Sequence, residues 1–91
     1  MSNRVTKMDL ANVLDRINAA AGQNLKPYSC DEDGNWTANV GSYILDWSYG
    51  QPRLVQLVTD GGGERDISKR GTKREVLEWM RMFEKGLEAR S

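Results

Sequence analysis

Helical periodicity is confined to the two flanks of this chain, and it constrains the fold more than any other feature. Thr6 and Asp9 form a capping pair before the first helical segment, and Gly22 ends it. The apolar stripe of this segment consists of Leu10, Val13, Leu14, Ile17 and Ala21. Thr72 and Glu75 match a capping box before the second segment. Its stripe consists of Val76, Met80, Phe83 and Leu87. The pattern predicts one amphipathic helix on each side of a middle segment.

The middle segment has the signature of short strands separated by turns. We expect four strands, over residues 26–30, 42–49, 53–60 and 64–68. The turn at 31–35 reads DEDGN and the turn at 61–63 is GGG, and both are rich in residues that favour reversals. The predicted fold class is therefore α+β, in the order α-β-β-β(-β)-α. We expect a two-layer sandwich, with two helices packed on an antiparallel sheet of three or four strands.

The two central strands raise the question of which sheet face is buried. In 42–49, Tyr43, Trp47 and Tyr49 alternate onto one face, which we expect to lie against the helices. In 53–60 both faces are apolar, so either the pair Leu54/Val58 or the pair Val55/Leu57 lies opposite the helices. That face would need a cover, from a second copy in a homodimer or from a host protein. The candidate interface residues are Ile44, Leu54, Val58, Trp79 and Met82.

Composition limits the function classes. The 91 residues suffice for one domain, 1–91, and they include no histidine and a single cysteine, Cys30. This removes histidine-based catalysis and an internal disulfide. The acidic turn lacks the ligand spacing of a calcium loop, and no Gly-Lys-Ser/Thr follows the glycines at 61–63. We therefore expect no enzymatic activity, no cofactor and no metal. No segment has the apolar run of a signal peptide or a membrane span, so we expect a cytoplasmic protein with no membrane partner.

The charge distribution singles out one basic segment, although the thirteen basic and thirteen acidic residues cancel overall. Lys69, Arg70, Lys73 and Arg74 cluster around the start of the second helix. The helix dipole already places partial positive charge there, so these cations suggest a bound anion such as a phosphate. The alternative is a solvated surface with intramolecular ion pairs. The sequence leaves both interpretations open.

Two family resemblances bear on function. Residues 49–87 combine a Tyr-Gly hairpin, a Gly-rich turn and the helix start GTKRE. In this they resemble small proteins of tailed phages and prophages, a group that carries no assigned active site. The resemblance implies a bacterial host cell. The helix–strands–helix order and the segment SKRGTKRE are also similar, more weakly, to the double-stranded-RNA-binding domain, whose basic helix start contacts RNA phosphates.

These observations give two functional expectations. The first is a non-enzymatic phage-type protein that binds a host or phage protein and modulates or inhibits a host system. The alternative is a module that binds double-stranded RNA or DNA through Lys69, Arg70, Lys73 and Arg74.

Overall fold

The computed structural model describes residues 4–90 and confirms the α+β class. Its helices are α1 (Lys7–Ala20) and α2 (Lys73–Arg90). Its strands are β1 (Tyr28–Cys30), β2 (Trp36–Ala38), β3 (Tyr43–Asp46), β4 (Arg53–Leu57) and β5 (Glu64–Asp66). A 3-10 turn, η1 (Ser48–Gly50), joins β3 to β4. None of the helices found in residues 4–90 is long and apolar enough to cross a membrane.

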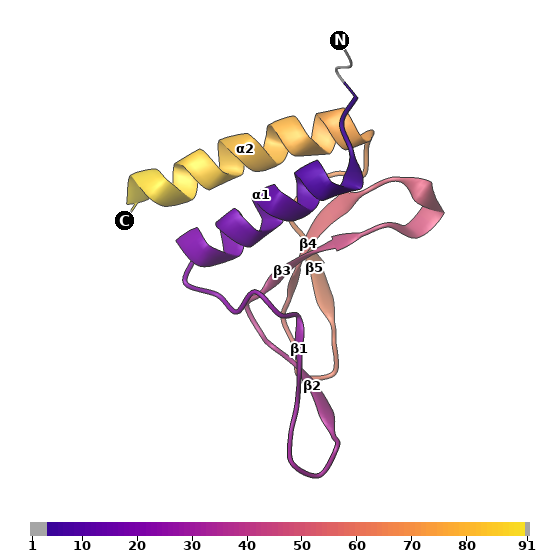
Figure 1. The fold of residues 1–91 in the computed structure, drawn as a ribbon, viewed down its shortest axis with the longest axis vertical. Coiled ribbons are helices and arrows are strands. Elements are labelled where there is room, and N and C mark those ends of the chain that lie inside the picture. Colours follow the sequence, from indigo (N-terminus) through magenta and orange to yellow (C-terminus); the bar gives the residue numbers. More distant parts are fainter. Residues whose placement is uncertain (1–3, 91) are drawn as a thin grey trace.

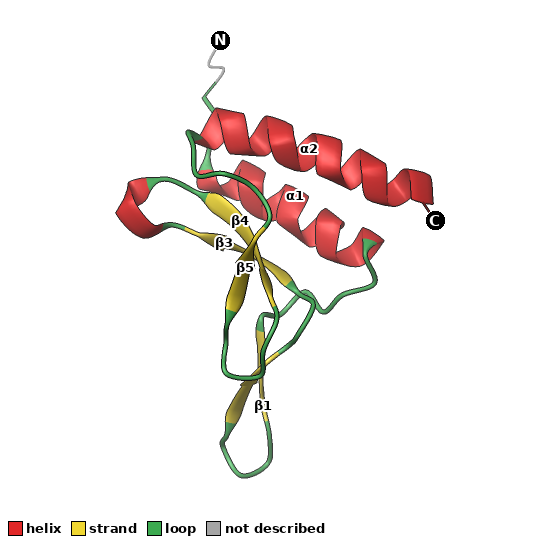
Figure 2. Ribbon diagram, turned by 180° about the vertical axis from the view of Figure 1, so that it is seen from behind, coloured by secondary structure: helices red, strands yellow, loops and turns green. Residues whose placement is uncertain are grey.

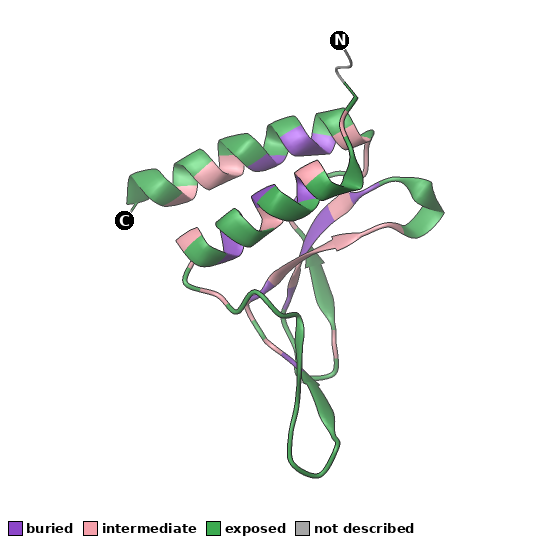
Figure 3. Ribbon diagram, in the orientation of Figure 1, coloured by how far each residue is buried: buried purple, intermediate pink, exposed green. Residues whose placement is uncertain are grey.

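The two helices lie side by side and pack on the three-stranded sheet β3-β4-β5 (Figures 1 and 2). Figure 3 shows that the buried positions of α1, α2 and β4 turn toward one another. The register pairs Leu45 with Leu54, which places both on the helix-facing side of the sheet. The core cluster consists of Leu10, Val13, Ile17, Leu54, Val76, Leu77 and Met80. Its apolar area comes from the two predicted stripes and from the central strand between them.

Both helices begin where local capping predicts. In α1 the Thr6 hydroxyl accepts a hydrogen bond from the Asp9 backbone N–H, and the Asp9 carboxylate accepts one from the Thr6 N–H. Gly22 follows the helix at φ +72°, in the left-handed region that glycine adopts without steric penalty. Thr72 and Glu75 form the same reciprocal pair before α2. Both predicted capping pairs are confirmed. They could be predicted because each involves residues only three positions apart.

The predicted antiparallel sheet of three or four strands under two helices is confirmed as the three-stranded sheet β3-β4-β5, but a second sheet was not predicted. Five short strands form two sheets, since β1 pairs with β2 in a hairpin of its own, separate from β3-β4-β5. Strand β2 was not predicted, because three residues give too little alternation to recognise. Asp31 closes the hairpin turn by accepting hydrogen bonds from the backbone N–H groups of Asp33 and Asn35. The hairpin projects away from the helices (Figure 1).

The predicted strand 42–49 ends early. Tyr43 and Trp47 pack against the core as expected, but Tyr49 is 94% exposed, with φ +62°. The chain turns here because Asp46 accepts hydrogen bonds from both the backbone N–H and the hydroxyl of Ser48. The expectation that Tyr49 joins the core is therefore wrong.

On the sheet face opposite the helices, the apolar residues of β4 are covered within one copy of the chain. Val55 and Leu57 lie on this face and are fully buried. Arg53 spans the same face, in ion pairs with Asp46 at 2.6 Å and with Asp66 at 3.1 Å. These two apolar side chains therefore need no cover from a partner. The expectation that the apolar pair on this face needs a cover does not hold for Val55 and Leu57, because neither has exposed area left in a single copy.

Candidate functional site

The predicted basic cluster spans the connection from β5 to α2 and the first turn of α2, and its first two residues lie beside a hollow of about 390 Å³. This hollow is lined by Ile67, Ser68, Lys69, Arg70, Gly71, Glu75, Val76 and Trp79. The loop is fixed from below by Ser68, a buried residue whose hydroxyl accepts the Leu54 backbone N–H at 3.0 Å. Two of the four predicted cations, Lys69 and Arg70, line this hollow, and so does the Glu75 carboxylate.

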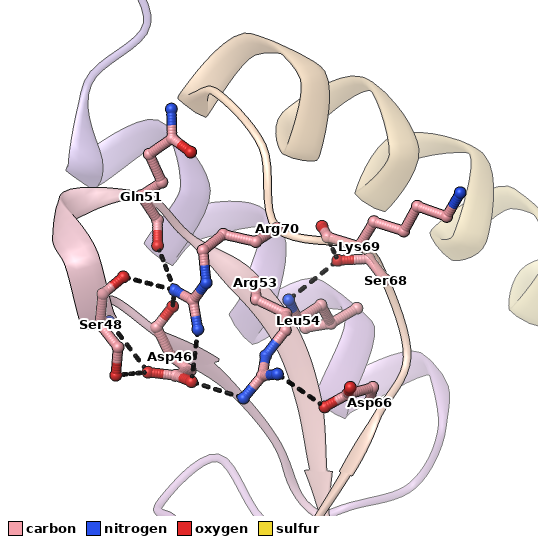
Figure 4. A network of polar contacts seen from close by, with 9 residues as sticks. All are labelled: Asp46, Ser48, Gln51, Arg53, Leu54, Asp66, Ser68, Lys69 and Arg70. Atoms are coloured by element: carbon pink, nitrogen blue, oxygen red, sulfur yellow. Dashed lines mark hydrogen bonds and ion pairs between the residues drawn. The ribbon is translucent and has the colours of Figure 1, made fainter.

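The guanidinium group of Arg70 is engaged in hydrogen bonds within the protein (Figure 4). Its guanidinium donates to the Asp46 carboxylate at 2.9 Å and to the backbone carbonyls of Asp46, Ser48 and Gln51. The Tyr49 ring lies 5.5 Å from the guanidinium carbon. Arg70 thus anchors the η1 turn to the start of α2. Because its N–H groups are already used in these hydrogen bonds, Arg70 has a structural role in holding residues 46–51 in place.

Asp46 is the anionic centre of this network. Its carboxylate accepts hydrogen bonds from the hydroxyl and backbone N–H of Ser48, and from Arg70 and Arg53. Ser48 contributes most, and with the two guanidinium groups it holds the pKa of Asp46 well below its ordinary value of 3.8. The group is therefore ionised at neutral pH, and it stabilises the fold as an acceptor and a counter-charge.

This pKa shift predicts a loss of stability in acid. Because the folded pKa lies below the unfolded one, the contribution of Asp46 is fully present above about pH 4 and is lost as the pH falls further. We expect the free energy of unfolding, measured by urea titration at pH 7 and pH 3, to fall less in Asp46→Asn than in the wild type. Equal losses in the two proteins would contradict the assignment.

The start of α2 is already capped by side chains of the chain itself. The Thr72 hydroxyl accepts the Glu75 backbone N–H at 3.2 Å, and Glu75 accepts the Thr72 N–H at 3.0 Å. The hydrogen bonds with the Thr72 backbone N–H and side chain hold the pKa of Glu75 below its ordinary value. Glu75 lines the hollow, so its negative charge opposes the binding of an anion there.

The remaining two cations do not converge with Lys69 and Arg70. Lys73 is half-buried on the first turn of α2, and Lys69 is exposed. Arg74 is exposed and lines a different hollow, together with Arg4, Val5, Asp9, Leu77, Glu78 and Arg81. Lys69 and Arg70 therefore line one hollow and Arg74 lines another, and the four predicted residues do not line one pocket.

The predicted interface residues are also dispersed. Leu54 is fully buried in the core under the helices, so its proposed role in an interface is corrected. Ile44 is half-buried on the opposite sheet face. Val58 is 42% exposed beyond the end of β4, while Trp79 and Met82 are exposed on α2. Periodicity could not separate Leu54 from Val55, because both faces of this strand are apolar.

A further exposed apolar surface lies on the β1–β2 hairpin, and none of its residues was among the predicted interface candidates. The register places Tyr28 opposite Ala38 and Cys30 opposite Trp36, so these four side chains share one face. Ser29 and Thr37 are paired on the other face, where Ser29 donates to Asn39. Trp36 is 69% exposed, and Cys30 is an exposed free thiol. On this face Trp36 and Cys30 are exposed, Tyr28 is 39% exposed and Ala38 is buried, so the part that faces solvent is formed by Trp36, Cys30 and part of Tyr28. In both strands, YSC and WTA, the outer residues are apolar or weakly polar and the middle residue is polar. This alternation indicates an amphipathic hairpin only when the strand pairing is known.

Comparison with protein-family models, with curated proteins and with solved structures finds no match. In the part of the chain that the structure describes, no three His, Cys, Asp or Glu side chains are grouped so as to hold a metal ion.

Proposed function

We propose that this chain is a non-enzymatic, phage-type protein of the bacterial cytoplasm that acts by binding another protein and modulating a host system. The observation that carries the proposal is the exposed part of the apolar face of the β1–β2 hairpin, formed by Trp36, Cys30 and Tyr28. A two-stranded hairpin has little stability of its own in water, and an exposed tryptophan on it gains nothing in the free protein. Such a face is typical of a surface that becomes buried in a complex.

The hairpin also indicates the chemistry of the partner. Its tip carries Asp31, Glu32 and Asp33, all exposed, next to the apolar face. A complementary surface is an apolar pocket for Trp36 with basic residues at its rim. Tryptophan is the residue type most often found at the energetic centre of such contacts.

The test is capture from a bacterial lysate by the full chain and by two matched variants. Trp36→Thr introduces a β-branched residue, which also favours a strand, and removes the anchor, whereas Thr37→Ser alters the polar face of the same strand. We expect a specific protein to be retained by the wild type and by Thr37→Ser, and to be reduced about tenfold or more with Trp36→Thr. Both positions are exposed, so stability should change by less than about 0.5 kcal/mol. Retention of the same proteins by all three would contradict the proposal.

Nucleic-acid binding is the second candidate, favoured by Lys69 and Lys73 near the start of α2. It rests on fewer groups than the sequence suggested, because Arg70 is engaged and Glu75 lies in the same hollow. Nuclease treatment separates the two candidates. Capture that disappears with nuclease, weakens steeply with salt and is lost in a Lys69→Ala/Lys73→Ala variant would support this candidate against the first.

A further inference from the structure

Helix α2 carries a second apolar stripe in addition to the one buried in the core. It consists of Trp79, Met82, Gly86 and Ala89, spaced by three, four and three residues, and it lies between Glu75 and Arg90. At 3.6 residues per turn these positions share one side of the helix. All of them are exposed, and Met82 is exposed by 73%. The stripe is stiffened by Trp79, whose ring stacks on Phe83 at 5.1 Å.

Gly86 is unexplained by the packing of a single copy. Glycine weakens the interior of a helix relative to alanine, and nothing lies within 4 Å of the position that a Cβ would occupy here. Beside it is a hollow of about 280 Å³ lined by Met82, Phe83, Gly86, Leu87 and Arg90. The missing side chain therefore leaves a notch on the surface, which is useful only if another group enters it.

The stripe is complementary to itself about a two-fold axis between Met82 and Phe83. Along the helix, Glu75 and Arg90 each lie about 11 Å from that point, on opposite sides, at about 1.5 Å per residue. Trp79 and Gly86 likewise lie about 5 Å to either side of it. In an antiparallel pair of α2 helices, Glu75 of one copy is level with Arg90 of the other, and Trp79 of one copy is level with the Gly86 notch of the other.

We infer that two copies of this chain form a symmetric dimer through antiparallel α2 helices. Three features meet in this arrangement: opposite charges at both ends, a large side chain facing a notch, and opposed helix dipoles. Since α2 is separate from the hairpin surface, the inference does not depend on the proposed function, and either can fail alone. The dimer places two hairpins in one particle, which would strengthen binding to a partner that offers two sites.

The test is the solution mass of the full chain by sedimentation equilibrium, at concentrations up to about 1 mM, so that even a dissociation constant of that size is detected. We expect the mass to rise toward twice 10.3 kDa. A mass that stays at one copy over the whole range, or one that rises beyond two copies, would overturn the inference.

Two variants test the notch itself. Gly86→Gln fills it with a side chain that favours helix, and should raise the dissociation constant by about tenfold or more through overpacking of a close contact. Arg81→Gln changes an exposed residue on another side of α2 and should leave the mass unchanged. Circular dichroism shows whether both variants keep their helices. An unchanged dissociation constant in a folded Gly86→Gln variant would refute the proposed contact.

Discussion

Replacing Leu54 with alanine should reduce the free energy of unfolding by about 3 kcal/mol, the middle of the range for a fully buried leucine. Leu54 has no exposed area and sits on the central strand, where it meets both helices. A cavity at this point cannot be closed by the movement of one side chain, because residues of α1, α2 and β3 all belong to the cluster around it. A domain of this size has little stability to spare, so a large fraction of the variant should be unfolded at 37 °C.

The matched control is Val58→Ala. Val58 follows the last residue of β4 and lies outside the core. Val58 is 42% exposed, so its truncation should change the free energy of unfolding by less than about 1 kcal/mol. Urea titration followed by tryptophan fluorescence measures both variants. Similar effects at the two positions would mean that Leu54 does not lie under the helices, and would return it to the list of interface candidates.

Arg70→Met should lower the free energy of unfolding by about 2 kcal/mol, because several hydrogen bonds to a charged group are lost together. Methionine preserves most of the length and apolar stem of arginine, and removes the fork that joins Asp46 to three backbone carbonyls. For a domain of this length the corresponding decrease in Tm is about 10 °C. Arg70→Lys should rescue little of it, because an ammonium group cannot satisfy these acceptors in the same geometry.

Two measurements distinguish this structural role from an anion site. Lys69→Met changes the adjacent exposed cation and should alter stability by less than about 0.5 kcal/mol. Inorganic phosphate should raise the Tm of the wild type no more than that of Arg70→Met. A phosphate-dependent rise in Tm that is present in the wild type and absent in Arg70→Met would instead identify Arg70 as an anion ligand.

The two exposed apolar surfaces lie on opposite parts of the molecule. The hairpin face is at the end that projects beyond the sheet, whereas the second stripe of α2 lies on the helical layer (Figure 1). The polar network around Asp46 lies between β3, β4 and the start of α2, and it holds the connecting loops in place. Binding through either surface therefore requires no rearrangement of the core or of this network.

The sequence by itself determined the features that depend on neighbours along the chain. Both helices and the capping pairs Thr6–Asp9 and Thr72–Glu75 could be predicted, because helix periodicity and capping are set within a few residues. The α+β class followed from those helices and from the alternating middle segment. The boundaries of the strands did not, since three-residue strands contain almost no period.

The tertiary structure decided which residues of equal local character became core, surface or structural ligand. Leu54 and Val55 are equivalent in the sequence, and only the packing of the helices assigns them to opposite faces. Arg70 stands among other cations, yet it alone of the predicted four is shown joined to Asp46, 24 positions earlier in the chain. Such pairings depend on the three-dimensional path of the backbone, which brings distant donors and acceptors within about 3 Å, and no local pattern records that path.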